Sequence, residues 1–273
     1  MAESISVLGC GWLGFPLAKT LLAQGYEVHG STTQPEKLNE LEEKGIKPYL
    51  IKLSPEVNAD ADPNFFRSDV LIINIPPRRR TDVEAFYPQQ VEAIIQQSPP
   101  PRIVFVSSTS VYPDLNRAVT EADIPTSESE KQSLRASGRA ILAAESLVKQ
   151  YSSQTTILRF CGLMGPDRHP GRFLAGKTLN SSGQAPVNFI HLDDCVAILA
   201  QIIRDGIWGE VFNACADEHP TKSVFYQRAT QKIGQKPPEF RADGELSFKQ
   251  IDSQRLKGQL GYQFIYADPT KAL

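Results

Sequence analysis

Short apolar runs alternate with segments of helical periodicity along the first part of the chain. The runs predict strands at residues 5–8, 27–30, 48–53, 70–75, 103–107 and 156–160, and the periodic segments predict helices near 14–24, 35–44, 82–97 and 137–150. Val70-Leu71-Ile72-Ile73 is apolar at every position, which is typical of a strand buried on both faces. This alternation predicts an α/β fold with a doubly wound parallel sheet covered by helices.

The rhythm changes after residue 165. Loops are predicted at residues 165–172 and 180–186, followed by a strand at 187–192, a helix at 193–204, a strand at 211–214 and a helix at 224–233. Asp193 is expected to cap its helix and His191 to satisfy local hydrogen bonds. We therefore expect a large lobe of residues 1–165, to which 187–215 contribute, and a smaller C-terminal α/β lobe of residues 166–186 and 216–273.

The first predicted strand runs directly into Gly9-Cys10-Gly11-Trp12-Leu13-Gly14, and a helix follows. G-x-G-x-x-G in this context is typical of the dinucleotide-binding loop of a Rossmann-type sheet. The first glycine permits the turn, the second lets a pyrophosphate approach the backbone, and the third allows close packing of helix and strand. The helix N-terminus then faces the phosphates. We predict a dinucleotide site in the large lobe, with a purely structural glycine turn as the alternative.

Two further strand ends bear on the cofactor. The end of the second strand faces the adenosine ribose in such sheets, where an acidic residue selects NAD. Here Ser31-Thr32-Thr33 carries no carboxylate and Lys37 follows, which favours NADP over NAD, although no arginine is present. Ile75 and Pro76 follow the fourth strand at the carboxyl edge, where ligands bind, so they are expected cofactor contacts. A plain strand-ending turn is the alternative for them.

Composition and charge exclude several classes of protein. The chain has 273 residues, 41% hydrophobic and 22% charged, which is ordinary for a globular protein. Its net charge of −2 gives no basic footprint, so no nucleic-acid partner is predicted. Arg78-Arg79-Arg80 is the strongest basic run, either a solvated loop or a contact with an anionic cofactor or substrate.

Location and metal binding are also constrained. The early first strand leaves no room for a signal peptide, and no apolar run reaches membrane-spanning length. The four cysteines lack C-x-x-C spacing, which fits reduced thiols in a cytoplasmic protein. The four histidines are dispersed, so no metal site is predicted.

Later motifs add a family resemblance. Val106-Ser107-Ser108-Thr109-Ser110-Val111-Tyr112 ends the fifth strand, and Leu158-Arg159-Phe160-Cys161-Gly162-Leu163-Met164-Gly165-Pro166 and Phe189-Ile190-His191-Leu192-Asp193-Asp194 come later. With the glycine loop, these resemble an atypical branch of the extended short-chain dehydrogenase/reductase family, whose members include NAD-dependent sugar-nucleotide epimerases and dehydratases. The resemblance covers nearly the whole chain. It implies an NAD or NADP cofactor, a small-molecule substrate such as a nucleotide sugar, and a homodimer. It also implies cofactor contacts at Ser107, Phe160, Cys161 and Gly162.

One departure from the family pattern decides whether the family's catalytic mechanism can be expected here. Ser108 matches the family's Ser or Thr that polarises the substrate. The family's acid/base Tyr is replaced by Ser137, and the Lys four residues later by Ile141, whereas Gly138 and Glu145 match. Serine is less acidic and shorter than tyrosine, and isoleucine cannot hydrogen-bond a ribose. We therefore expect the usual hydride mechanism to be absent or rerouted, with Ile141 on an apolar face that packs.

Substitute groups lie elsewhere in the sequence. His169, in a loop expected to border the substrate, could shuttle a proton near neutral pH, and a solvated loop is the alternative. Arg172 and Tyr112 are candidate substrate contacts, although the Tyr of a Val-Tyr pair usually packs. Two hypotheses remain: an oxidoreductase or epimerase with catalytic Ser108 and His169, or a non-catalytic NAD(P)-binding module. The start of the chain also resembles β-hydroxyacid dehydrogenases, but their glycine-rich helix with a catalytic Lys is not found.

Overall fold

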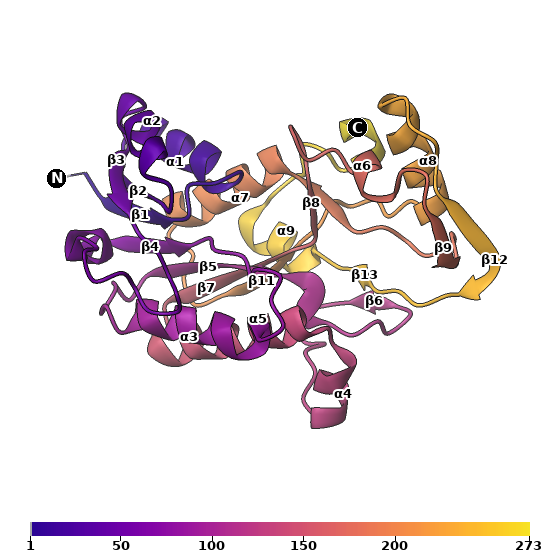
Figure 1. The fold of residues 1–273 in the computed structure, drawn as a ribbon, viewed down its shortest axis with the longest axis horizontal. Helices are drawn as coiled ribbons and strands as arrows, with labels where there is room; N and C mark the ends of the chain where they lie inside the picture. Colours follow the sequence, from indigo (N-terminus) through magenta and orange to yellow (C-terminus); the bar gives the residue numbers. More distant parts are fainter. Residues whose placement is uncertain (1) are drawn as a thin grey trace. The chain divides into compact units, whose positions relative to one another are not determined.

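The computed structural model describes residues 2–273, which form two compact units (Figure 1). The first contains the chain up to Val111, Gln132–Arg159 and Ile198–Val211. The second contains Tyr112–Lys131, Phe160–Ala197 and Phe212–Leu273. The units therefore interleave along the chain, and their bounds differ from the expected division, which placed residues 112–131 in the larger lobe and broke the chain at 165.

A seven-stranded sheet has the order β11-β7-β5-β4-β1-β2-β3. Its strands are β1 (Ser4–Leu8), β2 (Glu27–Thr32), β3 (Lys47–Leu50), β4 (Val70–Ile73), β5 (Ile103–Ser108), β7 (Thr155–Phe160) and β11 (Val211–Ala214). Parallel pairing joins β3 to β2, β2 to β1, β1 to β4, and β4 to β5. The strand order reverses between β1 and β4, and the carboxyl edge at such a reversal is where open α/β sheets bind ligands.

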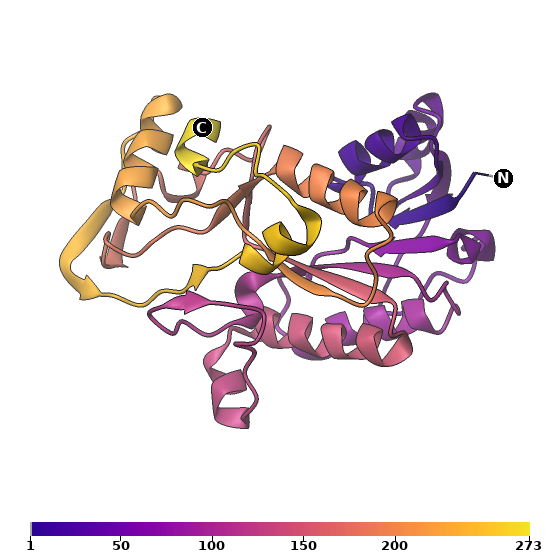
Figure 2. The ribbon, with the colours of Figure 1, turned by 180° about the vertical axis from the view of Figure 1, so that it is seen from behind.

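Helices cover both faces of this sheet. In the first unit they are α1 (Gly14–Ala23), α2 (Leu38–Glu43), α3 (Val83–Ile95) and α5 (Ala136–Tyr151), with short 3-10 turns at Pro35–Lys37, Pro63–Arg67 and Thr109–Val111. Figures 1 and 2 show α3 and α5 on one face and α1 and α2 on the other. Every residue of β4 is buried, so the α/β doubly wound prediction and the expected burial of this strand are confirmed.

The second unit has smaller sheets. Parallel pairs join β8 (Gly162–Met164) to β10 (Phe189–His191), β9 (Thr178–Ser181) to β12 (Glu239–Glu245), and β6 (Ala118–Val119) to β13 (Gln250–Ile251). The helices are α6 (Gly171–Leu174), α8 (Lys222–Lys232), α9 (Gln254–Leu260) and a 3-10 turn at Pro269–Ala272. Helices α4 (Glu128–Ser133) and α7 (Leu192–Arg204) begin in this unit and end in the first. Phe189 stacks on Phe225 with ring centroids 4.7 Å apart, at the centre of a core that includes Met164, Val187 and Tyr226.

Several expected elements are corrected by the structure. The strands expected at 48–53 and 70–75 end at Leu50 and Ile73, and the helix expected at 35–44 is a 3-10 turn followed by α2. The expected loops at 165–172 and 180–186 overlap α6 and β9. Strand β12 is mostly exposed and polar, so no apolar alternation marked it. The start of α7 is capped by His191, whose Nδ1 accepts the Asp193 N–H at 3.2 Å; Asp193 is not the cap.

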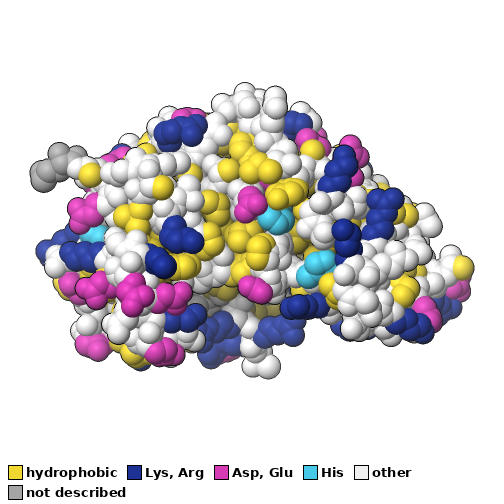
Figure 3. Space-filling model, turned by 90° about the horizontal axis from the view of Figure 1, so that it is seen from above, with side chains coloured by type: hydrophobic (Ala, Val, Ile, Leu, Met, Phe, Trp, Pro, Cys, Tyr) yellow, Lys and Arg dark blue, Asp and Glu magenta, His cyan; other side chains and the backbone are white. Residues whose placement is uncertain are grey.

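Two further findings concern the molecule as a whole. Within residues 2–273, no helix is both long and apolar enough to cross a membrane, and no three His, Cys, Asp or Glu side chains are grouped to hold a metal ion. On the face drawn in Figure 3, acidic and basic side chains are interspersed. This distribution fits the small net charge.

Candidate functional site

The three glycines of the loop between β1 and α1 differ in what surrounds them. Gly9 has φ +101°, and a Cβ added to it would lie 2.5 Å from the Asn74 carbonyl oxygen. A Cβ at Gly14 would collide with the Gly9 carbonyl oxygen. A Cβ at Gly11 would meet nothing within 4 Å. Gly9 and Gly14 are therefore needed for the loop to fold, whereas Gly11 leaves the backbone open to a ligand.

Side chains from the two neighbouring strands hold Gly9. Its N–H donates to Ser31 Oγ at 2.9 Å, and Asn74 Nδ2 donates to its carbonyl oxygen at 3.0 Å. The Cys10 N–H donates to the Ser31 carbonyl oxygen at 2.8 Å. Ser31 is the last residue but one of β2 and Asn74 follows β4, so both lie at the carboxyl edge beside β1. The role of Asn74 was missed from the sequence; an amide at the end of a strand that flanks the loop was the available signal.

The first turn of α1 is suited to an anion. It contains no acidic residue, and its N-cap, Leu13, makes no side-chain capping bond. Trp12 and Leu13 lead into this turn, Leu13 buried and Trp12 half-buried. Because the positive end of the helix dipole is not offset by a local carboxylate, the turn favours phosphate.

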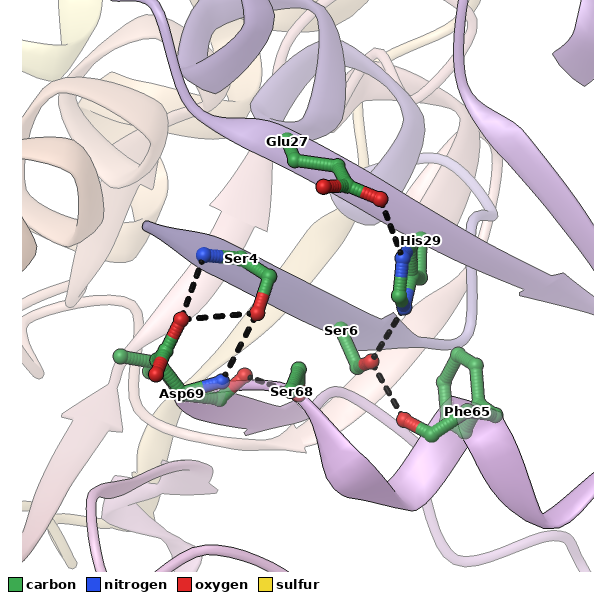
Figure 4. Close-up of polar contacts among 8 residues, drawn as sticks. Ser4, Ser6, Glu27, His29, Phe65, Ser68 and Asp69 are labelled. Carbon is green, nitrogen blue, oxygen red and sulfur yellow. Dashed lines mark hydrogen bonds and ion pairs between the residues drawn. The ribbon is translucent and has the colours of Figure 1, made fainter. Parts of the chain in front are cut away.

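At the carboxyl end of β2, where the ribose is expected, the hydroxyls of Ser31 and Thr32 are bound to the protein backbone. The Ser31 hydroxyl is buried and holds Gly9, while Thr32 Oγ1 accepts the Gln34 N–H at 3.1 Å. Thr33 and Lys37 are exposed. The acidic residue within β2, Glu27, is at the opposite end of the strand, where its carboxylate lies 3.2 Å from His29 Nε2 (Figure 4).

Figure 4 also shows how that opposite end is joined together. Ser6 Oγ donates to the Phe65 carbonyl oxygen at 2.5 Å, and Ser4 Oγ donates to Asp69 at 2.8 Å. The Ser4 bonds are the main cause that lowers the pKa of the Asp69 carboxyl. These contacts organise the N-terminal edge of the sheet, away from the glycine loop.

At the end of β5, Ser107 and Ser108 have separate surroundings. Ser107 is buried and donates its hydroxyl to Glu145 Oε1 at 2.6 Å. Ser108 is half-buried, and its Oγ accepts the Ser110 N–H at 3.2 Å. Ser108 is therefore the more accessible hydroxyl of the two, as its expected role requires.

Helix α5 carries the two substituted positions. Ser137 is half-buried, and Ile141 is only 5% exposed, on the same face as buried Ala144 and Val148. Gly138 packs so closely on the Ser110 carbonyl that a Cβ there would collide with it. The packing interpretation of Ile141 is confirmed, because its side chain belongs to the core.

In the second unit, several expected contacts are buried. Tyr112 is 1% exposed and donates its hydroxyl to Asn213 Oδ1 at 2.7 Å, which argues against the expected substrate contact. Phe160 and Cys161 are buried, and Gly162 is exposed. Burial raises the pKa of the Cys161 thiol well above its usual value, and in the first unit raises that of Cys10 to about 12. These thiols are therefore protonated and poorly nucleophilic.

His169 and Arg172 lie at the start of α6. His169 Nδ1 accepts the Gly171 N–H at 3.2 Å, so a neutral ring carries its proton on Nε2. Nε2 is buried and has no hydrogen-bond partner within the described residues. Burial lowers the pKa of His169, and the charges of Arg172 and Lys232 lower it further. The imidazole is therefore neutral near pH 7 and offers one unused donor. Arg172 is exposed.

Comparison with known proteins identifies the family of this chain. Residues 5–215 match the NAD dependent epimerase/dehydratase family. The chain is 35% identical to Protein YeeZ of Escherichia coli K12 over 274 aligned positions, covering 98% of this chain and 97% of that protein. The chain belongs to the NAD-dependent epimerase/dehydratase family.

Solved structures share the fold of this family member. UDP-glucuronic acid 4-epimerase from Bacillus cereus, in complex with NAD, has a TM-score of 0.76 and 20% identity, with 99% of this chain and 95% of that chain covered. UDP-N-acetylglucosamine 4-epimerase from Bacillus cereus has a TM-score of 0.73 and 18% identity, with 99% and 97% covered. The recognised resemblance is thus confirmed for both family and fold.

Family membership implies a nicotinamide dinucleotide, and the loop fits one. Gly11 leaves open space where the family's cofactor needs backbone access, and the first turn of α1 lacks a competing carboxylate. NAD(P) binding is therefore supported. The structure brings Gly9, Ser31 and Ile75 into contact, since the Ile75 side chain lies 3.6 Å from the Cβ position of Gly9. Ser107 and Ser108 lie farther along the same sheet. The other expected residues of the loop and of the ends of β2 and β4 are in the first unit, whereas Tyr112, Phe160, Cys161, Gly162, His169 and Arg172 are in the second.

Proposed function

We propose that this protein binds NAD(P) at the loop Gly9–Gly14 and acts as an oxidoreductase or epimerase on a small molecule, without the family's Tyr and Lys. The observation that carries the proposal is that the three glycines of the loop have different surroundings. A Cβ at Gly9 or Gly14 would collide with the backbone, whereas a Cβ at Gly11 would meet no atom within 4 Å. A glycine turn with a purely structural role would have no need of glycine at the open position.

The preference for NADP is part of the proposal. It is supported by the engagement of Glu27 with His29, which leaves the ribose end of β2 without a carboxylate from that strand. Exposed Thr33 and Lys37 would receive the 2′-phosphate, with Thr32 beside them. Ser31 is not assigned to the 2′-phosphate, because its hydroxyl accepts the hydrogen bond from the Gly9 N–H.

Ser108 and His169 are the two residues proposed for the chemistry. Ser108 has the accessible hydroxyl at the end of β5 and would polarise a substrate oxygen. His169 is neutral with a proton on Nε2, which has no partner among the described residues, so it would donate a hydrogen bond to a substrate oxygen. Arg172 would hold an anionic group of the substrate. The nicotinamide, when bound, supplies the hydride acceptor or donor.

The proposed substrate class is a nucleotide sugar. Its support comes from solved structures with this fold, which include epimerases named for UDP-sugars. The homodimer implied by the family and a cytoplasmic location, consistent with four buried free thiols, belong to the same proposal.

A second candidate is a non-catalytic NAD(P)-binding module. The specific observation in its favour is Ile141, which is in the core where the family's lysine would approach the ribose. Such a protein would bind the dinucleotide through the same loop and turn over nothing.

Calorimetric titration of the full chain with NADH and NADPH tests binding, and a panel of nucleotide sugars and carbonyl compounds tests turnover. We expect binding of both dinucleotides with NADPH tighter, and turnover that Ser108→Ala and His169→Gln each reduce at least tenfold. Binding without any turnover would support the non-catalytic module. No binding of either dinucleotide would overturn both.

A further inference from the structure

The segment between β4 and α3 is held against the glycine loop at its start. Asn74 Nδ2 donates to the Gly9 carbonyl oxygen at 3.0 Å, and the buried Tyr87 donates its hydroxyl to the Ile75 carbonyl oxygen at 2.9 Å. Pro76 and Pro77 follow, and each has its φ fixed by the pyrrolidine ring. The first half of this segment is therefore restrained in position and in backbone freedom.

The segment is also fixed at its end. Arg80 Nε and Nη2 donate to the two carboxylate oxygens of Asp82 at 2.8 and 2.9 Å. The same guanidinium lies 3.7 Å from the centre of the Phe86 ring, a cation–π contact at the start of α3. Of the three consecutive arginines, Arg80 thus has a clear structural role.

Arg78 and Arg79 differ from Arg80. Both are exposed, and neither makes an ion pair or hydrogen bond to any residue within 2–273. Neither guanidinium therefore has a paired carboxylate within the described chain. They sit on a segment whose ends are fixed, so they are presented at a defined place.

That place is beside the glycine loop. The Ile75 side chain lies 3.6 Å from the Cβ position of Gly9. Arg79 comes four residues after Ile75, and four residues of extended chain span at most about 14 Å. Both arginines thus lie within reach of the carboxyl edge where β1 and β4 adjoin.

We propose that Arg78 and Arg79 form a phosphate clamp for the dinucleotide, complementing the backbone of the glycine loop; this rests on the dinucleotide binding proposed above. Arginine forks bind phosphate oxygens in pairs, and both of these guanidinium groups are exposed with every donor unpaired within the described chain. The phosphate is either the pyrophosphate, which NAD and NADP share, or the 2′-phosphate, which only NADP carries.

The test is calorimetric titration of Arg78→Ala/Arg79→Ala with NADH and NADPH at low and high salt. We expect NADPH to bind at least tenfold more weakly than to wild type, with a shallower dependence on salt. An equal loss for NADH identifies the pyrophosphate, and a loss for NADPH alone identifies the 2′-phosphate. Arg78→Lys/Arg79→Lys keeps the charge without the fork, so its affinity should be intermediate.

The matched control is Lys44→Ala/Arg67→Ala. It removes the same charge from exposed positions that precede β3 and β4, at the opposite edge of the sheet, and should leave both affinities unchanged. Because the clamp residues are exposed and unpaired, thermal unfolding of the double variant should match wild type. Wild-type affinity in the clamp variant, or an equal loss in the control, would overturn the proposal. If wild type itself binds neither dinucleotide, the proposed function fails and the clamp fails with it.

Discussion

Glu145 of α5 and Arg159 of β7 form a fully buried ion pair. Arg159 Nε donates to Glu145 Oε1 at 2.9 Å and Arg159 Nη2 donates to Oε2 at 2.6 Å. The Arg159 side chain is 0% exposed and that of Glu145 is 3% exposed. Ser107 of β5 donates to the same carboxylate, so one acidic group joins a helix to two strands. Ser108, the proposed catalytic hydroxyl, is the next residue in the chain.

Glu145→Gln should therefore destabilise the protein strongly. The change leaves the Arg159 charge buried without its counterion, which typically costs about 3–5 kcal/mol. Equilibrium unfolding in urea measures it. The control is Glu84→Gln, which breaks the solvent-accessible pair with Arg139 and should change the free energy of unfolding far less than Glu145→Gln does. Equal losses of unfolding free energy in the two variants would show that the buried pair contributes no more to stability than the exposed one.

Gly9→Ala and Gly11→Ala should separate folding from binding. At Gly9 the positive φ and the close Asn74 carbonyl make a Cβ costly, so the free energy of unfolding should fall by about 1–3 kcal/mol. At Gly11 a methyl group has room, and stability should change by less than about 0.5 kcal/mol. The methyl group would, however, occupy the space a phosphate needs. Dinucleotide affinity of Gly11→Ala should therefore fall at least tenfold, measured by calorimetry, and unchanged affinity would count against the site.

His169 should make stability depend on pH. Its pKa in the folded state is lowered, chiefly by burial, so the unfolded chain binds a proton more readily. The free energy of unfolding should consequently be highest above the unfolded pKa of about 6.5 and fall as the pH drops from there through the folded pKa. Urea unfolding between pH 7.5 and 5 measures this, and His169→Gln should flatten the profile.

A direct titration by NMR distinguishes the causes. Lys232→Gln removes one of the two neighbouring charges and should raise the pKa of His169, while His219→Gln in the same unit should leave it unchanged. A His169 pKa at or above its ordinary value in wild type would contradict the neutral imidazole on which its proposed role depends.

Ile141→Lys should not restore the family's active site. The position is in the core, so an ammonium group there is desolvated, and we expect a loss of about 3 kcal/mol or more at pH 7. The loss should shrink at higher pH, where the amine is neutral. Ile141→Met and the exposed Ser146→Lys on the same helix are the controls, and both should unfold close to wild type. Wild-type stability of Ile141→Lys would mean that the helix has room for a lysine.

Local patterns were enough to predict much of the fold. The bounds of β11 and, within a residue or two, those of β1, α1 and α5 follow from apolar runs, helical periodicity and glycine positions, which are properties of neighbouring residues. The exposed pair of β9 and β12 was missed because polar strands that pair away from a core have no alternation to detect.

The sequence by itself determined the fold class, the dinucleotide loop and the loss of the family's tyrosine and lysine, because each is set by the identity and spacing of nearby residues. Only the tertiary structure decided which groups surround that loop. Ser31 lies 22 residues from Gly9 and Asn74 lies 65 residues from it, yet both bond to Gly9 because β1 is between β2 and β4. Strand order of this kind depends on long-range packing, which residue periodicity does not encode.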